Sequence, residues 1–423
     1  MLNGSLKVPG DKSITHRALI FASLVKGHVE IENMSTAQDC ADTALCMQKL
    51  GLEIERKPDE KGSVTVKSPG LSGLSQPKDL LYVGNSGTTI RLLSGLLSSL
   101  PIYCCLDGDE SIRKRPMARV IEPLSAMGAQ IEAREGKFAP MSIRGGGLAG
   151  RRFDLSVASA QVETCLLLAG LSADGRTTVA TPHLVRDHTR RMFGHMAVPY
   201  FEDDGAISVD RLSEALPSCR ISVPADISSA AFFLVCAALL KGSDLSLLSV
   251  GTNPGRTLVL DALSGMGADI EHLNERLVDG EPVADIRIRG AGRLTGITLG
   301  AADLPAGIDE IPILSLAGSL CEGEMVVEGA SELRHKESDR LALLVSNLSA
   351  NGADIEERQD GFVISGRKTV KGGALWETRG DHRMAMSGAI ASLLFEQPVR
   401  IDDQACIAVS YPEFFQDLES VKG

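Results

Sequence analysis

The chain has 423 residues, of which 43% are hydrophobic and 23% charged, and its formal net charge is −12. These values are typical of a globular protein with a large buried core, and the length alone allows about three domains. The negative charge and the 4% aromatic content disfavour binding to nucleic acid or to an anionic membrane surface. We therefore expect neither kind of partner.

Nine cysteines are scattered through the chain, with no C-x-x-C pair and no spacing typical of zinc ligands. Free thiols of this kind fit a reducing compartment. The N-terminal region lacks the basic and apolar parts of a signal peptide, and the longest apolar run, 230–240, is too short to span a bilayer. We expect a cytoplasmic protein without a bound metal.

One short sequence pattern recurs along the chain: an apolar, helix-like run, then a glycine, then a short strand that ends in an acidic residue. Glycine just past a helix end readily takes the left-handed conformation that stops the helix. We therefore predict a helix end followed by a strand at each copy. The copies span 49–55, 126–132, 265–271 and 350–356, with the glycines Gly51, Gly128, Gly267 and Gly352, and a degenerate copy spans 194–200.

Another predicted helix precedes this sequence pattern, and it too ends before a glycine. Examples are the helices predicted at 16–26, 230–241 and 311–322. The predicted repeat is a strand, a helix, a strand, a helix and a pair of strands, with a period of roughly 70 to 85 residues. A sixth, truncated copy begins near Trp376 and closes with a helix at about 412–421. Six copies indicate an α/β protein with two pseudo-symmetric halves of three repeats each.

Cationic or glycine-rich segments stand at the predicted entrances of several helices, where free backbone N–H groups attract anions. Ser13 or Thr15 can cap the first of these helices, and helical spacing would put Lys336 and Arg340 on one face. Taken singly, each segment also fits a capped helix or a solvated cluster of charges. The segments are 11–17, 84–91, 113–119, 186–191, 334–340 and 379–383.

Taken together, these segments favour a binding site for small, heavily anionic reactants. In a symmetric array the helix entrances could converge on the cleft between the two halves. Arginine binds carboxylates and phosphates with two parallel hydrogen bonds, and lysine adds a point charge. Two phosphates and two carboxylates would bring roughly five to six negative charges to such a site. The turn at 84–91 lacks P-loop spacing, so a nucleoside triphosphate is not indicated.

Eight motifs in this order make the sequence resemble the 5-enolpyruvylshikimate-3-phosphate (EPSP) synthase family over essentially its whole length. The motifs are PGDKSITHR from Pro9, GNSGTTIR from Gly84, KRPM from Lys114, SAQ from Ser159, RDHT from Arg186, IDEIP from Ile308, KESDR from Lys336 and GDHRMAM from Gly380.

The resemblance implies an inverse α/β prism of two similar domains, each built from three βαβαββ repeats, with the active site in the interdomain cleft. Residues 1–11 and 226–423 would form the first, discontinuous domain, and residues 12–225 the second. It also implies an enzyme of the shikimate pathway to chorismate and the aromatic amino acids. That enzyme transfers the enolpyruvyl group of phosphoenolpyruvate to the 5-hydroxyl of shikimate 3-phosphate and releases phosphate. No cofactor is expected, and we expect a monomer.

The resemblance further assigns roles to residues that match the family's motifs. Asp309 is expected to take the proton of the attacking hydroxyl, Glu337 to protonate the methylene carbon, and Lys12 to lie between both substrates. The residues expected to bind shikimate 3-phosphate are Lys12, Ser13, Arg17, Ser159, Ala160, Gln161, Arg186, Asp309 and Lys336. The residues expected to bind phosphoenolpyruvate are Lys12, Gly87, Arg115, Gln161, Arg340 and Arg383.

Three alternatives remain at this point. UDP-N-acetylglucosamine enolpyruvyl transferase shares the fold and the donor but uses a loop cysteine, which the stretch 108–119 lacks. An RNA-end-processing protein on a related repeat fold is disfavoured by the negative charge and the few aromatic residues. A non-catalytic relative would be expected to lose Asp309, Glu337 or Lys12, and all three are present.

Overall fold

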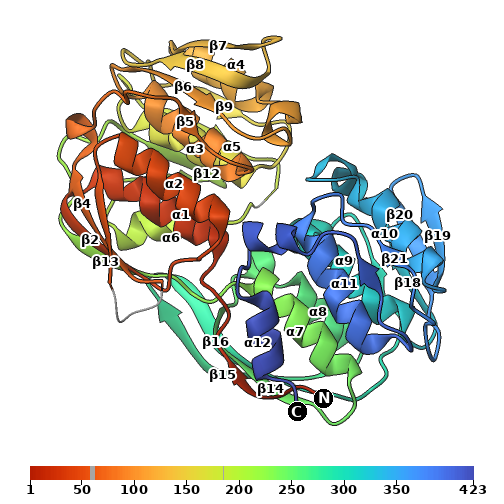
Figure 1. Cartoon of the computed structure of the whole chain (residues 1–423). Coiled ribbons are helices and arrows are strands. Elements are labelled where there is room, and N and C mark those ends of the chain that lie inside the picture. Colours follow the sequence, from red (N-terminus) through yellow and green to blue (C-terminus); the bar gives the residue numbers. More distant parts are fainter. Residues whose placement is uncertain (58–61, 184) are drawn as a thin grey trace. The chain divides into compact units, whose positions relative to one another are not determined.

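The computed structural model describes residues 1–57, 62–183 and 185–423. The chain divides into two compact units, which we call unit 1, made of Met1–Asp11 with Pro224–Gly423, and unit 2, made of Lys12–Val223 (Figure 1). Unit 1 is discontinuous, and the two chain ends lie together in it, since the N–H of Asn3 donates to the carbonyl of Val421 at 2.8 Å. The predicted division fell after residues 11 and 225, so it differs by two residues at the second crossing.

Unit 2 contains three four-stranded sheets within its described residues, each with the helices of one repeat. The first repeat has α1 (Lys12–Phe21), β2 (Lys26–Glu32), α2 (Gln38–Lys49), β3 (Glu53–Arg56), β4 (Val64–Pro69) and, from the far end of the unit, β13 (Cys219–Ser222). The second has β5 (Leu81–Tyr82), α3 (Gly87–Ser98), β6 (Tyr103–Asp107), α4 (Ala118–Met127), β7 (Gln130–Arg134) and β8 (Phe138–Arg144). The third has β9 (Arg152–Asp154), α5 (Ala160–Gly170), β10 (Thr177–Ala180), α6 (His188–His195), β11 (Phe201–Asp203) and β12 (Ala206–Val209).

Unit 1 is built in the same way, with two four-stranded sheets and a shorter, two-stranded one. Its first repeat has β1 (Asn3–Leu6), α7 (Ile227–Leu239), β14 (Asp244–Gly251), α8 (Leu258–Gly265), β15 (Asp269–Val278) and β16 (Glu281–Arg289). The second has β17 (Thr298–Leu299), α9 (Ile311–Ser319), β18 (Glu324–Val327), α10 (Arg340–Ala350), β19 (Asp354–Arg358) and β20 (Gly361–Ser365). The last, truncated repeat has β21 (Leu375–Trp376), α11 (His382–Leu394), β22 (Arg400–Ile401) and α12 (Phe414–Ser420).

Every four-stranded sheet has one parallel pair followed by two antiparallel strands, for example β5-β6-β8-β7. This arrangement matches the predicted order of strand, helix, strand, helix and strand pair. Two strands are exchanged between repeats: β1 precedes α1 in the chain but pairs with β14, and β13 precedes α7 but pairs with β2. That exchange makes unit 1 discontinuous.

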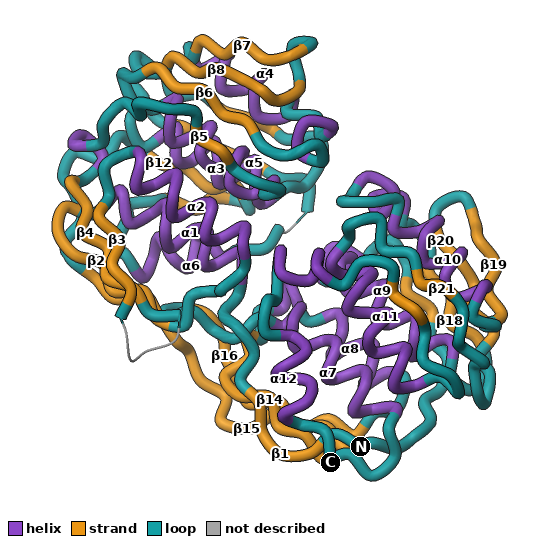
Figure 2. Tube along the Cα trace, in the orientation of Figure 1, coloured by secondary structure: helices purple, strands orange, loops and turns teal. Residues whose placement is uncertain are grey.

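In each unit the first helix of every repeat lies toward the interior, and the strands lie toward the outside (Figures 1 and 2). In unit 1 these are α7, α9 and α11, which pack on one another. Helix α7 is apolar on every side, and all 13 of its residues are buried, as expected for a helix without a solvent face. In unit 2, α3 packs so closely on α5 that a Cβ atom at Gly95 would lie 2.0 Å from the carbonyl oxygen of Cys165.

The glycine-ended helices of the repeat are confirmed by the backbone. Gly51, Gly128, Gly267 and Gly352 have φ angles of 108°, 115°, 90° and 92°, the left-handed region that glycine adopts without a steric penalty. The helix boundaries of the preceding helices are less accurate. The helix predicted at 16–26 begins at Lys12 and ends at Phe21, so Ser13 and Thr15 lie inside α1 and do not cap it.

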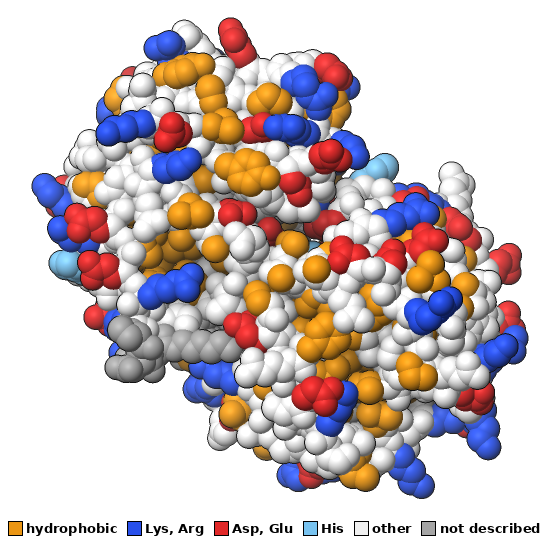
Figure 3. All heavy atoms as spheres, viewed as in Figure 1, with side chains coloured by type: hydrophobic (Ala, Val, Ile, Leu, Met, Phe, Trp, Pro, Cys, Tyr) orange, Lys and Arg blue, Asp and Glu red, His pale blue; other side chains and the backbone are white. Residues whose placement is uncertain are grey.

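Among the described residues, none of the helices is both long enough and apolar enough to cross a membrane. On the face drawn in Figure 3, lysine and arginine side chains are interspersed with aspartate and glutamate. That face therefore offers no continuous basic surface of the kind that binds a polyanion.

Candidate active site

The entrance of α1 carries the first predicted site residues. The Nζ of Lys12 lies 2.9 Å from Oδ2 of Asp39 on α2, and the Lys12 side chain is 25% exposed. Ser13 follows Lys12 and offers its backbone carbonyl to Nη1 of Arg17 at 3.0 Å.

Arg17, in the middle of α1, is buried, and its contacts include two threonine hydroxyls. Its Nε donates to Oγ1 of Thr189 at 2.9 Å, and its Nη2 donates to Oγ1 of Thr164 at 3.1 Å. The two threonines come from α6 and α5, so Arg17 ties three helices together. Neither threonine was predicted as a site residue, although Thr189 ends the RDHT motif and Thr164 follows the SAQ motif by three residues.

At the entrance of α3, glycine leaves room for two guanidinium groups. Ser86 caps the helix by accepting the N–H of Thr89 at 3.1 Å, a role that the sequence analysis did not assign to it. A Cβ atom at Gly87 would lie 2.9 Å from Nη1 of Arg91 and 3.0 Å from Nη1 of Arg115. The position of Gly87 therefore brings the backbone of the helix entrance directly against two cations.

The entrance of α5 is joined to that of α3 by Gln161. Its Oε1 accepts a hydrogen bond of 2.7 Å from Nη1 of Arg91, and its Nε2 donates to Oγ1 of Thr88 at 2.9 Å. Ser159 caps α5 with its side chain, and Ala160 is the first residue of the helix. Arg91, which was not predicted as a site residue, thus links Gln161 to Gly87.

The segment before α6 contributes less directly. Arg186 is half-buried just before this helix. Arg190, farther along α6, donates from Nη2 to Oε2 of Glu163 at 3.0 Å. Burial raises the pKa of the Glu163 carboxyl, and the charge of Arg190 only partly opposes that rise. Glu163 and Arg190 form a buried pair next to Thr164, and hence next to the Arg17 site.

In unit 1, a single guanidinium binds three carboxylates. Arg340 is 1% exposed, and its Nη1 lies 3.0 Å from Oδ1 of Asp309. Its Nη2 lies 2.5 Å from Oε2 of Glu337, and its Nε lies 2.8 Å from Oδ2 of Asp381. Burial disfavours the charge on Arg340, but the carboxylates outweigh that effect and raise its pKa above the ordinary value. Asp309, the predicted base, and Glu337, the predicted acid, are therefore held by one cation.

Two further predicted cations belong to the same cluster. The Nζ of Lys336 lies 3.5 Å from Oδ1 of Asp309. Nη1 of Arg383 donates to the backbone carbonyl of Asp309 at 3.1 Å and to Oε1 of Glu310 at 3.3 Å. The prediction that Lys336 and Arg340 share a helix face is wrong, because α10 begins only at Arg340. Both side chains nevertheless reach Asp309.

Asp381 anchors this cluster and was not predicted as a site residue. It caps α11, since its Oδ1 accepts a hydrogen bond from the N–H of Arg383 at 2.9 Å. Its Oδ2 also accepts a hydrogen bond from the hydroxyl of Ser338 at 3.1 Å. Aspartate directly before a helix is a common cap. The position of Asp381 directly before His382 could therefore have predicted its capping role. Burial raises the pKa of Asp381, but attraction to Arg340 outweighs that effect and leaves it below the ordinary 3.8.

This lowered pKa predicts an acid-dependent loss of stability in unit 1. A carboxylate with a depressed pKa in the folded state contributes stability above its unfolded pKa and loses it as the pH falls through the folded value. We therefore expect the free energy of unfolding to fall as the pH drops below 3.8. The Asp381→Asn variant should be less stable at neutral pH and should show a flatter decline, which urea denaturation across the acid range would measure. A decline as steep as that of the wild type would contradict the assignment.

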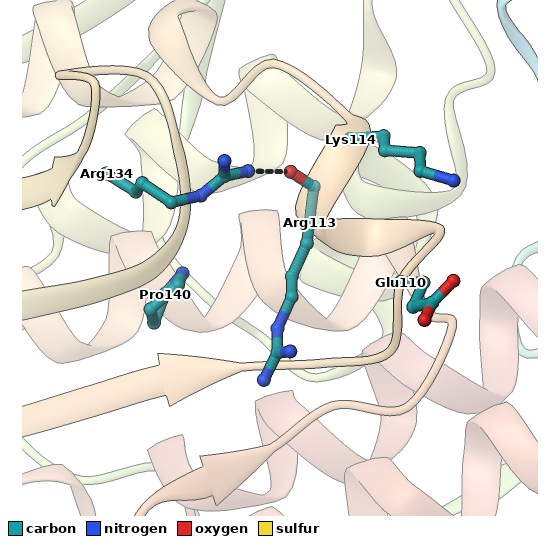
Figure 4. A pocket seen from close by; sticks show the side chains of 5 residues that line it. All are labelled: Glu110, Arg113, Lys114, Arg134 and Pro140. Carbon is teal, nitrogen blue, oxygen red and sulfur yellow. Dashed lines mark hydrogen bonds between the residues drawn. The ribbon is translucent and has the colours of Figure 1, made fainter.

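A surface hollow of about 560 Å³ in unit 2 holds none of the predicted site residues (Figure 4). The guanidinium of Arg134 points at the backbone carbonyl of Arg113, and Lys114 points elsewhere (Figure 4). The Arg113 side chain is paired with Asp107. We do not assign the site to this hollow, because Arg113 and Arg134 already serve internal contacts. In the part of the chain that the structure describes, no group of three or more His, Cys, Asp or Glu could hold a metal ion.

The predicted residues thus form clusters at helix entrances of both units. In unit 2 they are Lys12, Ser13, Arg17, Gly87, Arg115, Ser159, Ala160, Gln161 and Arg186, and in unit 1 they are Asp309, Lys336, Glu337, Arg340 and Arg383.

Comparison with known proteins identifies the family. The family model described as EPSP synthase (3-phosphoshikimate 1-carboxyvinyltransferase) matches residues 1–418. The 3-phosphoshikimate 1-carboxyvinyltransferase of Pelotomaculum thermopropionicum is 46% identical over 99% of this chain and 96% of its own length. The protein of the same name from Bacillus licheniformis is 44% identical, with 99% and 97% covered.

Solved structures agree with this result. The EPSP synthase of Acinetobacter baumannii superimposes with a TM-score of 0.88 at 40% identity, covering 99% of this chain and 96% of that one. The enolpyruvyl transferase NikO of Streptomyces tendae, at 16% identity, has a TM-score of 0.79 and shares the fold. The family model, the two relatives named 3-phosphoshikimate 1-carboxyvinyltransferase and the Acinetobacter baumannii structure favour the predicted function over the UDP-N-acetylglucosamine alternative. The chain belongs to the EPSP synthase family and is a transferase.

Proposed function

We propose that the protein transfers the enolpyruvyl group of phosphoenolpyruvate to the 5-hydroxyl of shikimate 3-phosphate and releases inorganic phosphate. The observation that carries the proposal is the contact of Arg340 with both Asp309 and Glu337, with Lys336 and Arg383 in the same cluster. A base, an acid and several cations therefore lie in one cluster of unit 1. A reaction that adds and then eliminates groups between two anionic substrates needs a proton acceptor, a proton donor and cations that bind the substrates.

The two carboxylates divide the proton transfers. Glu337 donates a proton to the methylene carbon of phosphoenolpyruvate, and the neighbouring carbon becomes oxocarbenium-like. The 5-hydroxyl attacks that carbon while Asp309 accepts the hydroxyl proton, which gives a tetrahedral intermediate. Loss of a proton from the new methyl group then expels phosphate and restores the double bond. Positioned acids and bases contribute roughly 10² to 10⁴-fold to such steps.

The cations of both clusters serve binding and charge stabilisation. Arg115, Arg340 and Arg383, with Gly87 and Gln161, would hold phosphoenolpyruvate. Arginine suits its carboxylate and phosphate because a guanidinium donates two parallel hydrogen bonds. The residues that would hold shikimate 3-phosphate are Ser13, Arg17, Ser159, Ala160, Gln161, Arg186, Asp309 and Lys336, and Lys12 would contact both substrates. Holding two reactants in line contributes roughly 7–11 kcal/mol, so binding geometry should outweigh either carboxylate.

A measurement of phosphate release tests the function. Phosphoenolpyruvate would be mixed with shikimate 3-phosphate in one reaction and with UDP-N-acetylglucosamine in another. We expect turnover only with shikimate 3-phosphate. Turnover with the sugar nucleotide alone would reverse the proposal. Action as a monomer, location in the cytoplasm and the lack of a cofactor stay predictions.

Gly87→Ala should weaken binding of phosphoenolpyruvate selectively. The new Cβ atom would lie within 3.0 Å of the ends of two arginine side chains and would displace them. Hydrogen bonds to charged groups contribute about 1.5–3 kcal/mol, so KM for phosphoenolpyruvate should rise roughly 10- to 100-fold. Gly194→Ala is the matched control, since its nearest atom lies 3.7 Å away. Initial rates over a range of phosphoenolpyruvate concentrations measure the effect, and an unchanged KM would contradict it.

A further inference from the structure

A chain of buried polar side chains in unit 1 connects the place where the polypeptide enters and leaves the unit with Arg383. The chain leaves unit 1 after Asp11 and returns at Pro224. The two passing segments pair there: the N–H of Asp11 donates to the carbonyl of Pro224 at 2.8 Å, and the N–H of Asp226 donates to the carbonyl of Pro9 at 2.9 Å. Each of the two paired segments therefore contributes one aspartate, Asp11 or Asp226, to the place where they pair.

Both aspartates meet the guanidinium of Arg256, which is 4% exposed. Nη1 of Arg256 lies 3.4 Å from Oδ2 of Asp11, and Nη2 lies 3.2 Å from Oδ1 of Asp226. Nη2 also donates to Oγ of Ser228 at 2.6 Å. A buried cation of this kind needs partners, because an unpaired charge in the interior is costly.

From Ser228 the connection continues to the site. Oγ of Ser228 donates to Oε1 of Glu310, which is fully buried, and the same Oε1 accepts Nη1 of Arg383 at 3.3 Å. The serine hydroxyl has one proton, and it points toward Glu310 because Arg256 can only donate. The direction of every hydrogen bond is therefore fixed, from Arg256 through Ser228 to Glu310. Glu310 in turn is one of two groups that hold Nη1 of Arg383, the other being the carbonyl of Asp309.

We propose that Arg256, Ser228 and Glu310 are positioning residues that hold the Arg383 guanidinium in place for phosphoenolpyruvate. This inference rests on the proposed function of Arg383. Glu310 lies within the IDEIP motif, but none of the three residues was assigned a role from sequence. The carboxylate of Glu310 orients Arg383, and Ser228 orients that carboxylate by joining it to the charge of Arg256. The position of Arg383 thereby depends on the paired segments at Asp11 and Asp226.

The substitution Ser228→Ala tests the inference with the smallest change, since it removes one hydroxyl and leaves every charge in place. We expect KM for phosphoenolpyruvate to rise about tenfold, the usual effect of losing a hydrogen bond to a charged group. Binding of shikimate 3-phosphate alone, measured by calorimetry, should change less than twofold. Ser387→Ala is the matched control, because this serine is also buried in unit 1 and its hydroxyl has no hydrogen-bond partner among the described residues.

Glu310→Gln gives a second, independent variant, because the amide oxygen still accepts hydrogen bonds but carries no charge. It should raise KM for phosphoenolpyruvate less than Glu310→Ala does. An unchanged KM in Ser228→Ala, or equal weakening of both substrates together with a lower Tm, would overturn the inference and leave a structural role only. Absence of turnover in the wild type would instead refute the proposed function. A crystal structure of Ser228→Ala decides the geometry without substrates: we expect Arg383 to leave the carbonyl of Asp309, and an unmoved guanidinium would contradict the inference.

Discussion

Asp309→Asn is expected to lower kcat by roughly 10² to 10⁴-fold, the range by which a positioned base accelerates a proton transfer. The amide has nearly the shape of the carboxylate and can still accept hydrogen bonds from Arg340 and Lys336 on one oxygen. It cannot accept the proton of the attacking hydroxyl. The change should therefore appear in kcat while KM for phosphoenolpyruvate moves much less.

Steady-state kinetics and single-turnover phosphate release would measure this effect. Asp303→Asn is the matched control, since Asp303 is an exposed carboxylate a few residues earlier that accepts only the N–H of Gly300 at 2.9 Å in the contacts described. A kcat of Asp309→Asn within tenfold of the wild type would assign the base to another group. A rise in KM without a fall in kcat would reduce Asp309 to a binding residue.

The repeat architecture could be predicted from sequence because its signals are local. Gly128 and Gly267 end helices through their own backbone freedom, and nearby apolar residues define each helix. The exchange of β1 and β13 between repeats could not be predicted from the pattern, since the paired residues lie 241 positions apart for β1 with β14 and 190 positions apart for β13 with β2. Only the family resemblance indicated where the chain crosses.

Local signals also misled in two places. Ser13 and Thr15 are good capping residues, yet α1 begins before both, and the hydroxyl of Thr15 instead accepts the N–H of Ser35 at 3.0 Å. Lys336 and Arg340 are spaced as on one helix face, but Lys336 lies outside the helix. Helix α10 begins after Asp339, which caps it by accepting the N–H of Ala342 at 3.0 Å. A cap signal therefore competes with a spacing signal, and the cap decides where the helix begins.

The site residues could be named from motifs, but their contacts could not. The partners of Arg340 stand 31, 3 and 41 positions away, at Asp309, Glu337 and Asp381. No periodicity links such positions, and a motif does not show which of its members touch. Asp381 was quoted within a motif and still missed, because its role depends on burial beneath Arg340.

The second large effect is expected from Arg340→Met, which should abolish activity and lower the free energy of unfolding by about 3–5 kcal/mol, the cost of removing one partner from a buried ion pair. Asp381 is fully buried and would lose the charge that keeps it ionised. Asp309 and Glu337 would lose the group that holds both of them. Urea denaturation followed by circular dichroism, with kcat/KM for both substrates, measures the two effects.

Two companion variants separate the stability effect from the catalytic one. Arg367→Met removes an exposed arginine of the same unit that pairs with Asp354 at 3.3 Å, and it should cost only about 0–1 kcal/mol. The double variant Arg340→Met with Asp381→Asn removes both charges of the buried pair, so it should regain part of the lost stability. It should not regain activity, because Asp309 and Glu337 still lack their common cation. Recovery of activity in the double variant would show that Arg340 acts only by neutralising Asp381. A double variant no more stable than Arg340→Met would show that the Arg340–Asp381 pair does not account for the lost free energy of unfolding.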